Sequence, residues 1–127
     1  MVPEDLKYTK EHEWVRIKGN EATIGITDHA QSELGDITFI ELPSKGKQIS
    51  KSDSIATIES VKAASDIFAP LSGEIKAVNE TLENAPEVIN QSPYGDGWIC
   101  RISLSEASEQ GELMGATEYT KFLEGSE

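Results

Sequence analysis

Short runs of alternating apolar and polar residues, separated by turn signals, recur along most of this chain. Ala22, Ile24 and Ile26 alternate with small or polar residues, and a period of two is typical of a β-strand with one buried face. Gly19 and Asn20 come just before this run and predict a hairpin turn. Further strands are expected at 37–42, 55–61, 66–69, 74–78 and 98–104. The pattern therefore predicts a mainly β protein, folded as a barrel-like sandwich with a few short helices.

Helix signals are few and short. Thr27 or Asp28 is expected to cap a turn that ends at Gly35, because side-chain oxygens bind the free N–H groups at a helix start and glycine suits a helix end. Ser105 and Thr117 are expected to cap two later helical turns. We therefore expect these three helices to be short additions to a fold that is built mainly from strands.

The stretch 79–94 contains two prolines and predicts a long, mostly irregular connection, in which Pro86 can open a single helical turn. The chain has 127 residues, which is enough for one hydrophobic core. We expect a single domain over residues 1–127, with a hairpin at about 55–69 and a C-terminal helical segment at about 105–124.

The formal net charge is −12, which argues against nucleic acid as a partner because a polyanion would be repelled. Acidity favours solubility and steers a protein towards basic patches on other proteins. No apolar stretch approaches the roughly 20 residues of a membrane span. No leader pattern precedes the first predicted strand. We expect a monomer in the bacterial cytoplasm, with no membrane contact.

Thiol and metal chemistry are not indicated. Cys100 is the only cysteine and shares the apolar face of its predicted strand with Ile102 and Leu104, so it is interpreted as a core residue. His12 and His29 are far apart in sequence, and neither is spaced as a metal ligand from another histidine or the cysteine. We expect no metal site.

Lys62 lies alone among small and apolar residues, between two predicted strands. A solitary amine on a projecting turn is well suited to be an attachment point, because acylation removes its charge and makes it the root of a flexible arm. Val61, Ala63 and Ala64 form a small, uncharged collar that would fit into another protein's active site. The pattern indicates a carrier that hands a bound group between other proteins.

The chain resembles the glycine cleavage system H-protein family over nearly its whole length. The strongest match is the segment around the lysine, Glu59-Ser60-Val61-Lys62-Ala63-Ala64-Ser65-Asp66, followed by Ala69-Pro70 and Ser72-Gly73-Glu74. Other matching stretches occur in the same order: His12-Glu13-Trp14-Val15, Ala22-Thr23-Ile24-Gly25-Ile26-Thr27, Leu34-Gly35-Asp36, Glu41-Leu42-Pro43, Pro93-Tyr94-Gly95-Asp96-Gly97-Trp98 and Glu118-Tyr119. The resemblance implies a single lipoyl-carrier domain with the barrel-sandwich hybrid fold of lipoyl and biotinyl carriers.

The resemblance also implies (R)-lipoate in amide linkage to Lys62, attached by a lipoate ligase or a lipoyl/octanoyl transferase. Glu59 and Gly73 stand where the family presents features to that enzyme, although Gly73 is also explained as a turn glycine. In the family, a glycine decarboxylase (P protein) loads an aminomethyl group onto the arm. An aminomethyltransferase (T protein) removes it with release of ammonia, and dihydrolipoyl dehydrogenase (L protein) reoxidises the arm. The carrier itself catalyses none of these steps.

The family further implies that the loaded arm folds back into a cleft on the carrier. Glu13 and Asp66 are the candidates for holding its ammonium end, because carboxylates pair with cations. The alternative for both residues is an exposed surface acid. The resemblance thus adds a substrate cleft to the attachment lysine.

Several other functions remain open at this level. A lipoyl relay to 2-oxo acid dehydrogenases would use the same lysine. A biotinyl carrier usually has methionines beside its lysine, and a lipoyl domain of a 2-oxo acid dehydrogenase usually has aspartate before it, whereas Val61 and Ala63 flank Lys62 here. An enzyme using Lys62 as a Schiff-base amine would need a desolvated amine beside an acid or base. A scaffold protein would leave the lysine without a role.

Overall fold

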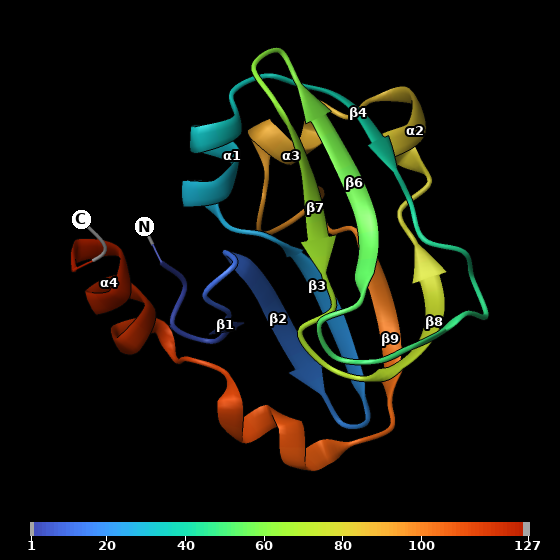
Figure 1. Ribbon diagram of the computed structural model, residues 1–127, viewed down its shortest axis with the longest axis vertical. Coiled ribbons are helices and arrows are strands. Elements are labelled where there is room, and N and C mark those ends of the chain that lie inside the picture. Colours follow the sequence, from blue (N-terminus) through green and yellow to red (C-terminus); the bar gives the residue numbers. More distant parts are fainter. Residues whose placement is uncertain (1, 126–127) are drawn as a thin grey trace.

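The computed structural model describes residues 2–125, which form two β-sheets with short helices at their margins (Figure 1). The larger sheet has six strands in the order β1-β2-β3-β9-β8-β5. Their bounds are Lys7–Tyr8, Glu13–Lys18, Glu21–Ile26, Cys100–Leu104, Gly73–Val78 and Gln48–Ile49. The smaller sheet has the order β4-β6-β7, with bounds Ile37–Glu41, Ser54–Ser60 and Ala64–Phe68. Every pairing is antiparallel.

The helices are all short. Within the described residues four are α-helical, namely α1 (Asp28–Leu34), α2 (Thr81–Asn84), α3 (Val88–Gln91) and α4 (Ala116–Glu124), and η1 (Ala107–Glu112) is a 3₁₀-helix. As predicted, Thr27 caps α1 by accepting the Ala30 N–H, and Gly35 ends the helix with a positive φ of 78°. The helices α1 and α3 contact each other, and α2 packs against β4.

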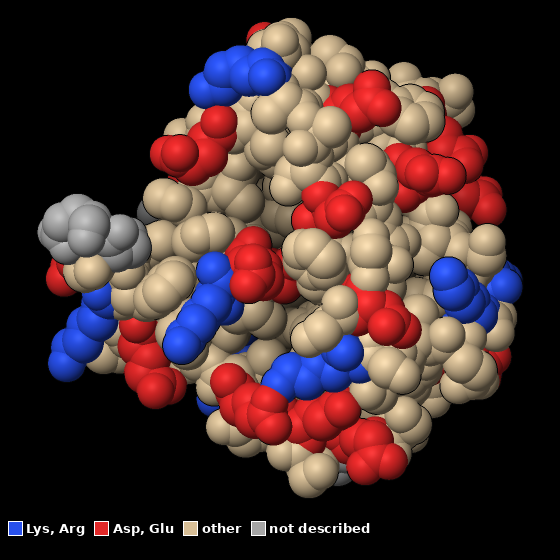
Figure 2. Space-filling model, viewed as in Figure 1, with Lys and Arg blue, Asp and Glu red and all other residues tan. Residues whose placement is uncertain are grey.

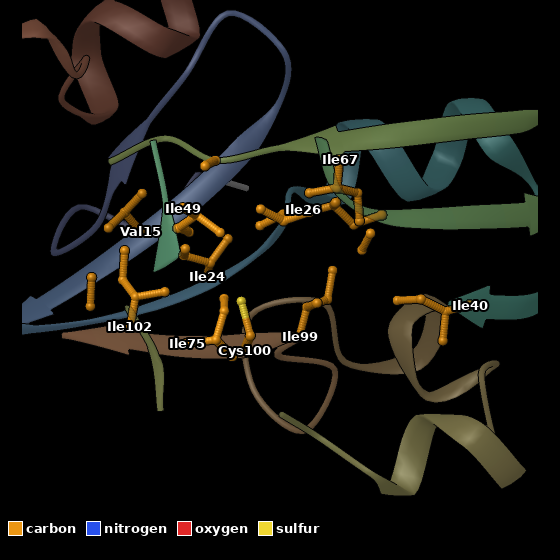
Figure 3. Packing of buried hydrophobic residues seen from close by; sticks show 14 of the residues in the cluster. Val15, Ile24, Ile26, Ile40, Ile49, Ile67, Ile75, Ile99, Cys100 and Ile102 are labelled. Carbon is orange, nitrogen blue, oxygen red and sulfur yellow. The ribbon is translucent and has the colours of Figure 1, made fainter. Parts of the chain in front are cut away.

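The main core lies between the two sheets (Figure 3). Ile24, Ile75 and Ile102 come from the six-stranded sheet, and Ile58 and Ile67 come from the other sheet. Full burial of each such side chain contributes roughly 1.5–3 kcal/mol to folding. Cys100 belongs to this core, as predicted, and burial raises the pKa of its thiol to about 12.

A second apolar cluster covers part of the outer face of the six-stranded sheet. Trp14 lies flat over Gly25, where a Cβ atom would come within 2.5 Å of the indole ring. Tyr8 and Tyr119 stack with ring centroids 4.6 Å apart. Since Tyr119 belongs to α4, this stack attaches the last helix to the strands that begin the chain.

Several predicted boundaries are wrong. The last strand begins at Cys100 and not at residue 98, η1 begins after Glu106 without a cap from Ser105, and α4 begins after Gly115 rather than at a Thr117 cap. The stretch 79–94 contains two helical turns, α2 and α3, where a mostly irregular connection with a single turn after Pro86 was expected. The turn α3 follows Pro86, whereas α2 was not predicted. Each turn buries one apolar side chain completely, Leu82 in α2 and Ile89 in α3, so tertiary packing stabilises turns that local sequence signals do not specify.

The surface is predominantly acidic. Figure 2 shows carboxylate side chains scattered over the face that carries the three-stranded sheet, with only a few cationic side chains among them. None of the helices within residues 2–125 is long and apolar enough to cross a membrane.

Candidate functional site

Lys62 lies in the turn between β6 and β7, and its side chain is exposed. Ser60 organises this turn. Its Oγ accepts the N–H groups of Lys62 and Ala63 at 3.2 and 3.1 Å, and its backbone N–H donates to the Ala63 carbonyl at 2.8 Å. Local bonds of this type fix a short turn without help from the core. The lysine is therefore presented on a defined loop at the end of a projecting hairpin (Figure 1).

The hairpin tip also rests on the segment that joins α1 to β4. The Val61 N–H donates to the Asp36 carbonyl at 3.0 Å, and Ile37 pairs with Ser60 at the start of β4. A Cβ atom on Gly35 would lie 3.3 Å from Cε of Lys62, so the aliphatic stem of the lysine crosses this glycine. The segment 35–37 thus supports the tip from the β4 side, while β7 forms the free edge of the sheet.

A pocket of about 290 Å³ lies between the hairpin, α1 and the start of β2. The hairpin contributes Ile58, Asp66 and Ile67, α1 contributes Leu34, and β2 contributes Glu13. The two acids that the sequence singled out therefore line one pocket, although 52 residues separate them in the chain. Apolar side chains on two walls make it a partly desolvated site.

Glu13 is almost completely buried, with 2% of its surface exposed, which excludes the alternative of an exposed surface acid. Its Oε1 accepts the Thr9 hydroxyl at 2.6 Å, and its Oε2 accepts the Phe68 N–H at 3.1 Å. Burial raises the pKa of this carboxyl group to about 7, against the lowering effect of the two hydrogen bonds. Glu13 is consequently poised to gain or lose a proton near neutral pH.

Asp66 is exposed on β7, the edge strand of its sheet. Its Oδ1 accepts the Thr57 hydroxyl at 3.2 Å across the hairpin. Asp66 thus differs from Glu13 in being a solvated carboxylate that also lines the pocket. The pocket combines one buried acid with one exposed acid.

His12 and His29, treated separately in the sequence, meet at the same pocket with ring centroids 4.6 Å apart. His12 adopts a positive φ of 70° in the turn before β2, and its Nδ1 is 2.8 Å from the Tyr119 hydroxyl. Burial and the neighbouring His29 lower the pKa of His12. Nothing in the spacing of the two histidines signals this meeting, because it depends on how α1 folds against the turn. Among residues 2–125, no cluster of His, Cys, Asp and Glu is arranged to hold a metal ion.

The remaining two candidates lie outside the pocket. Glu59 is exposed on β6, between Phe39 of β4 and Ala64 of β7 in the strand register. Gly73 is buried at the start of β8. It follows the C-terminal end of β7, which is the end away from the hairpin tip. A Cβ atom there would come within 2.1 Å of the Ser103 carbonyl oxygen of β9. The structure thus explains Gly73 by close packing of two strands, which differs from the turn role expected from sequence.

Comparisons with known proteins agree on one family. The family model described as "Glycine cleavage H-protein" matches residues 6–126. A glycine cleavage system H protein from Rubrobacter xylanophilus is 51% identical over 126 residues, which are 99% of this chain and 98% of the relative. One from Photorhabdus laumondii is 54% identical over 127 residues, with the same coverage. The crystal structure of a glycine cleavage system H protein from Mycobacterium marinum superposes with a TM-score of 0.84 at 36% identity, covering 94% of this chain and 97% of that one.

Proposed function

Because the chain belongs to the glycine cleavage H-protein family, the lipoyl carriers of the glycine cleavage system, we propose that Lys62 is the residue that carries the lipoyl group. The family match favours this function over a lipoyl relay or a biotinyl carrier. The observation that supports Lys62 most strongly is its position, exposed in a hairpin turn that Ser60 and Asp36 hold in place.

The residues around Lys62 fit such a group. Val61 is 66% exposed, and Ala63 and Ala64 are exposed as well, so the surroundings of the amine are small and uncharged. The same hairpin forms one wall of the pocket through Asp66 and Ile67. The lipoyl group, when bound, supplies a dithiolane that takes up the aminomethyl group of glycine and then holds two reducing equivalents. The chain itself positions this group and catalyses none of the reactions.

Glu13 and Asp66 are proposed to receive a cationic ammonium group in the pocket. The carboxyl group of Glu13, with its pKa of about 7, is partly protonated near neutral pH. A nearby cation favours the carboxylate form, so Glu13 would release its proton when a cation enters. Asp66 adds a second carboxylate at the exposed side. These residues bind and orient, and they take no part in bond cleavage.

The partners follow from the chemistry of the system. The P, T and L proteins would each accept the Lys62 arm in turn, and a lipoate ligase or lipoyl/octanoyl transferase would attach it. Glu59 stands on the exposed face of the hairpin, where such an enzyme could contact it. We place this exchange in the bacterial cytoplasm, in line with the bacterial sources of the relatives.

Lipoylation of the purified chain tests the assignment of Lys62. Incubation with a lipoate ligase, lipoate and ATP should add the mass of one lipoyl group to the wild type and nothing to Lys62→Arg, because a guanidinium cannot form this amide. Lys18→Arg is the matched control, since Lys18 is also exposed beside a hairpin turn. A lipoyl adduct on Lys62→Arg would show that another amine is the acceptor.

A further inference from the structure

The side chain of Asn90, in α3, makes three hydrogen bonds, one each to α1, to the link between α1 and β4, and to the first residue of β4. Its Oδ1 accepts the Ile37 N–H, and its Nδ2 donates to the Gly35 carbonyl and to Oε1 of Gln31, all at 2.9 Å. The two backbone partners determine the orientation of the amide, because one offers only a donor and the other only an acceptor. Asn90 thus holds the end of α1 and the start of β4 together.

The segment that Asn90 holds is the one on which the hairpin tip rests. Gly35 lies under the stem of Lys62, and the carbonyl of Asp36 accepts the Val61 N–H. Asn90 therefore bonds to the residue on each side of Asp36, which in turn bonds to the residue immediately before the lysine. Gly35 has a positive φ of 78°, a conformation that a residue with a side chain rarely adopts.

We propose that Asn90 is a positioning residue for the modification of Lys62. This proposal rests on the function proposed above. By fixing the Gly35–Ile37 backbone, Asn90 holds the tip in the one position that the acylating enzyme recognises. Without the amide, the Gly35 carbonyl and the Ile37 N–H lose their partner, so this segment becomes more mobile. The hairpin tip then becomes more mobile as well, because the hydrogen bond between Asp36 and Val61 joins it to the segment. Binding of a rigid loop by an enzyme loses less conformational entropy than binding of a mobile loop.

A steady-state assay of lipoylation against carrier concentration tests this proposal. Asn90→Ala should raise KM for the apo carrier about three- to tenfold with a smaller change in kcat, as expected when one or two hydrogen bonds that preorganise a binding loop are lost. The matched control is Asn79→Ala. Asn79 is a more deeply buried asparagine of the same connection, and its Nδ2 donates to the carbonyls of Asp96 and Trp98, away from the hairpin. Both variants are compared at equal folded fraction.

A second measurement separates positioning from accessibility. A small acylating ester needs no recognition of the loop, so it should acylate Lys62 at the same rate in the wild type and in Asn90→Ala. Hydrogen exchange at the Val61 amide should be faster in Asn90→Ala and unchanged in Asn79→Ala. Equal KM values for the wild type and Asn90→Ala, or equal losses in both asparagine variants, would overturn the proposal. Failure of the wild type itself to be lipoylated at Lys62 would instead overturn the proposed function.

Discussion

At the scale of single residues, the raised pKa of Glu13 predicts a specific pH dependence of stability. The folded state holds this proton more tightly than the unfolded state, so its contribution is fully present below pH 4.5 and is lost as the pH rises to about 7. The shift corresponds to roughly 3 kcal/mol, at 1.36 kcal/mol per pKa unit. Glu13→Gln keeps the shape without the charge, so it should gain on the order of 2 kcal/mol over the wild type between pH 5 and pH 8.

Urea denaturation of both proteins at several pH values measures this difference. The pKa of His12 is lowered, so its contribution has the opposite sign, being lost as the pH falls through its folded-state pKa. That contribution is common to both proteins and cancels in the comparison. A constant difference between wild type and Glu13→Gln across this range would mean that Glu13 is ionised in the folded protein throughout.

The sequence alone singles out Lys62 as a candidate because its surroundings are local, a small-residue collar between two alternating runs. The burial of Glu13 could not be predicted, since its Oε2 accepts the N–H of Phe68, 55 residues away. The meeting of His12 with His29, and the hydrogen bonds of Asn90, likewise depend on tertiary packing. Residue types therefore predict candidates for the pocket, whereas their burial and partners follow from the fold.

Glu13 and Asp66 are expected to slow the loss of the carried aminomethyl group. A carrier loaded with the aminomethyl group should release ammonia several-fold faster when Glu13→Gln and Asp66→Asn are combined, because hydrogen bonds to charged groups contribute roughly 1.5–3 kcal/mol. The control combines Glu21→Gln with Glu41→Gln, two exposed strand acids that do not line this pocket. The same rate of ammonia release in the wild type and in both double variants would show that the two pocket acids do not hold the group.

At the scale of elements, the longer strands were predictable, whereas the two-residue strands β1 and β5 were not, and the short helices were predicted only in part. Period-two alternation indicates which face of a strand is buried, and the predicted strands agree with β3, β4, β6, β7 and β8 to within a few residues. The turn α2 was missed and α3 was indicated only by Pro86, because each turn depends on one buried side chain, Leu82 or Ile89. Their capping residues make no side-chain hydrogen bond, so the usual signal of a helix start is absent.

Gly73 gives a prediction at this scale, because a Cβ atom at this position of β8 would overlap the Ser103 backbone of β9. Gly73→Ala should reduce the free energy of unfolding by about 1–3 kcal/mol, since the new Cβ would overlap the Ser103 backbone and force the strands apart. Gly111→Ala is the control, as no atom lies within 4 Å of its added Cβ. Thermal denaturation measures the stability, and lipoylation at equal folded fraction should be unchanged. Loss of lipoylation with unchanged stability would assign Gly73 to enzyme recognition instead.

At the scale of the whole molecule, two sheets enclose an isoleucine-rich core, and the hairpin extends from the smaller sheet at one end (Figure 1). The alternation of the strands predicted a barrel-like sandwich, and the structural match to a glycine cleavage system H protein confirms the fold. Local sequence signals do not show which sheet carries the hairpin or which pocket it borders, since both follow from long-range strand pairing. The net charge of −12 suits a carrier that meets several partner proteins, because charge complementarity steers such encounters.

Glycine cleavage reconstituted with purified P, T and L proteins tests the central claim most directly. The measured quantity is carbon dioxide released from glycine over many turnovers, with limiting carrier. Lipoylated wild type should support sustained release, whereas the unlipoylated wild type and Lys62→Arg treated with the lipoate ligase should give only the background seen without carrier. Release by Lys62→Arg at the wild-type rate would contradict the account, because it would show that glycine cleavage proceeds without an arm on Lys62.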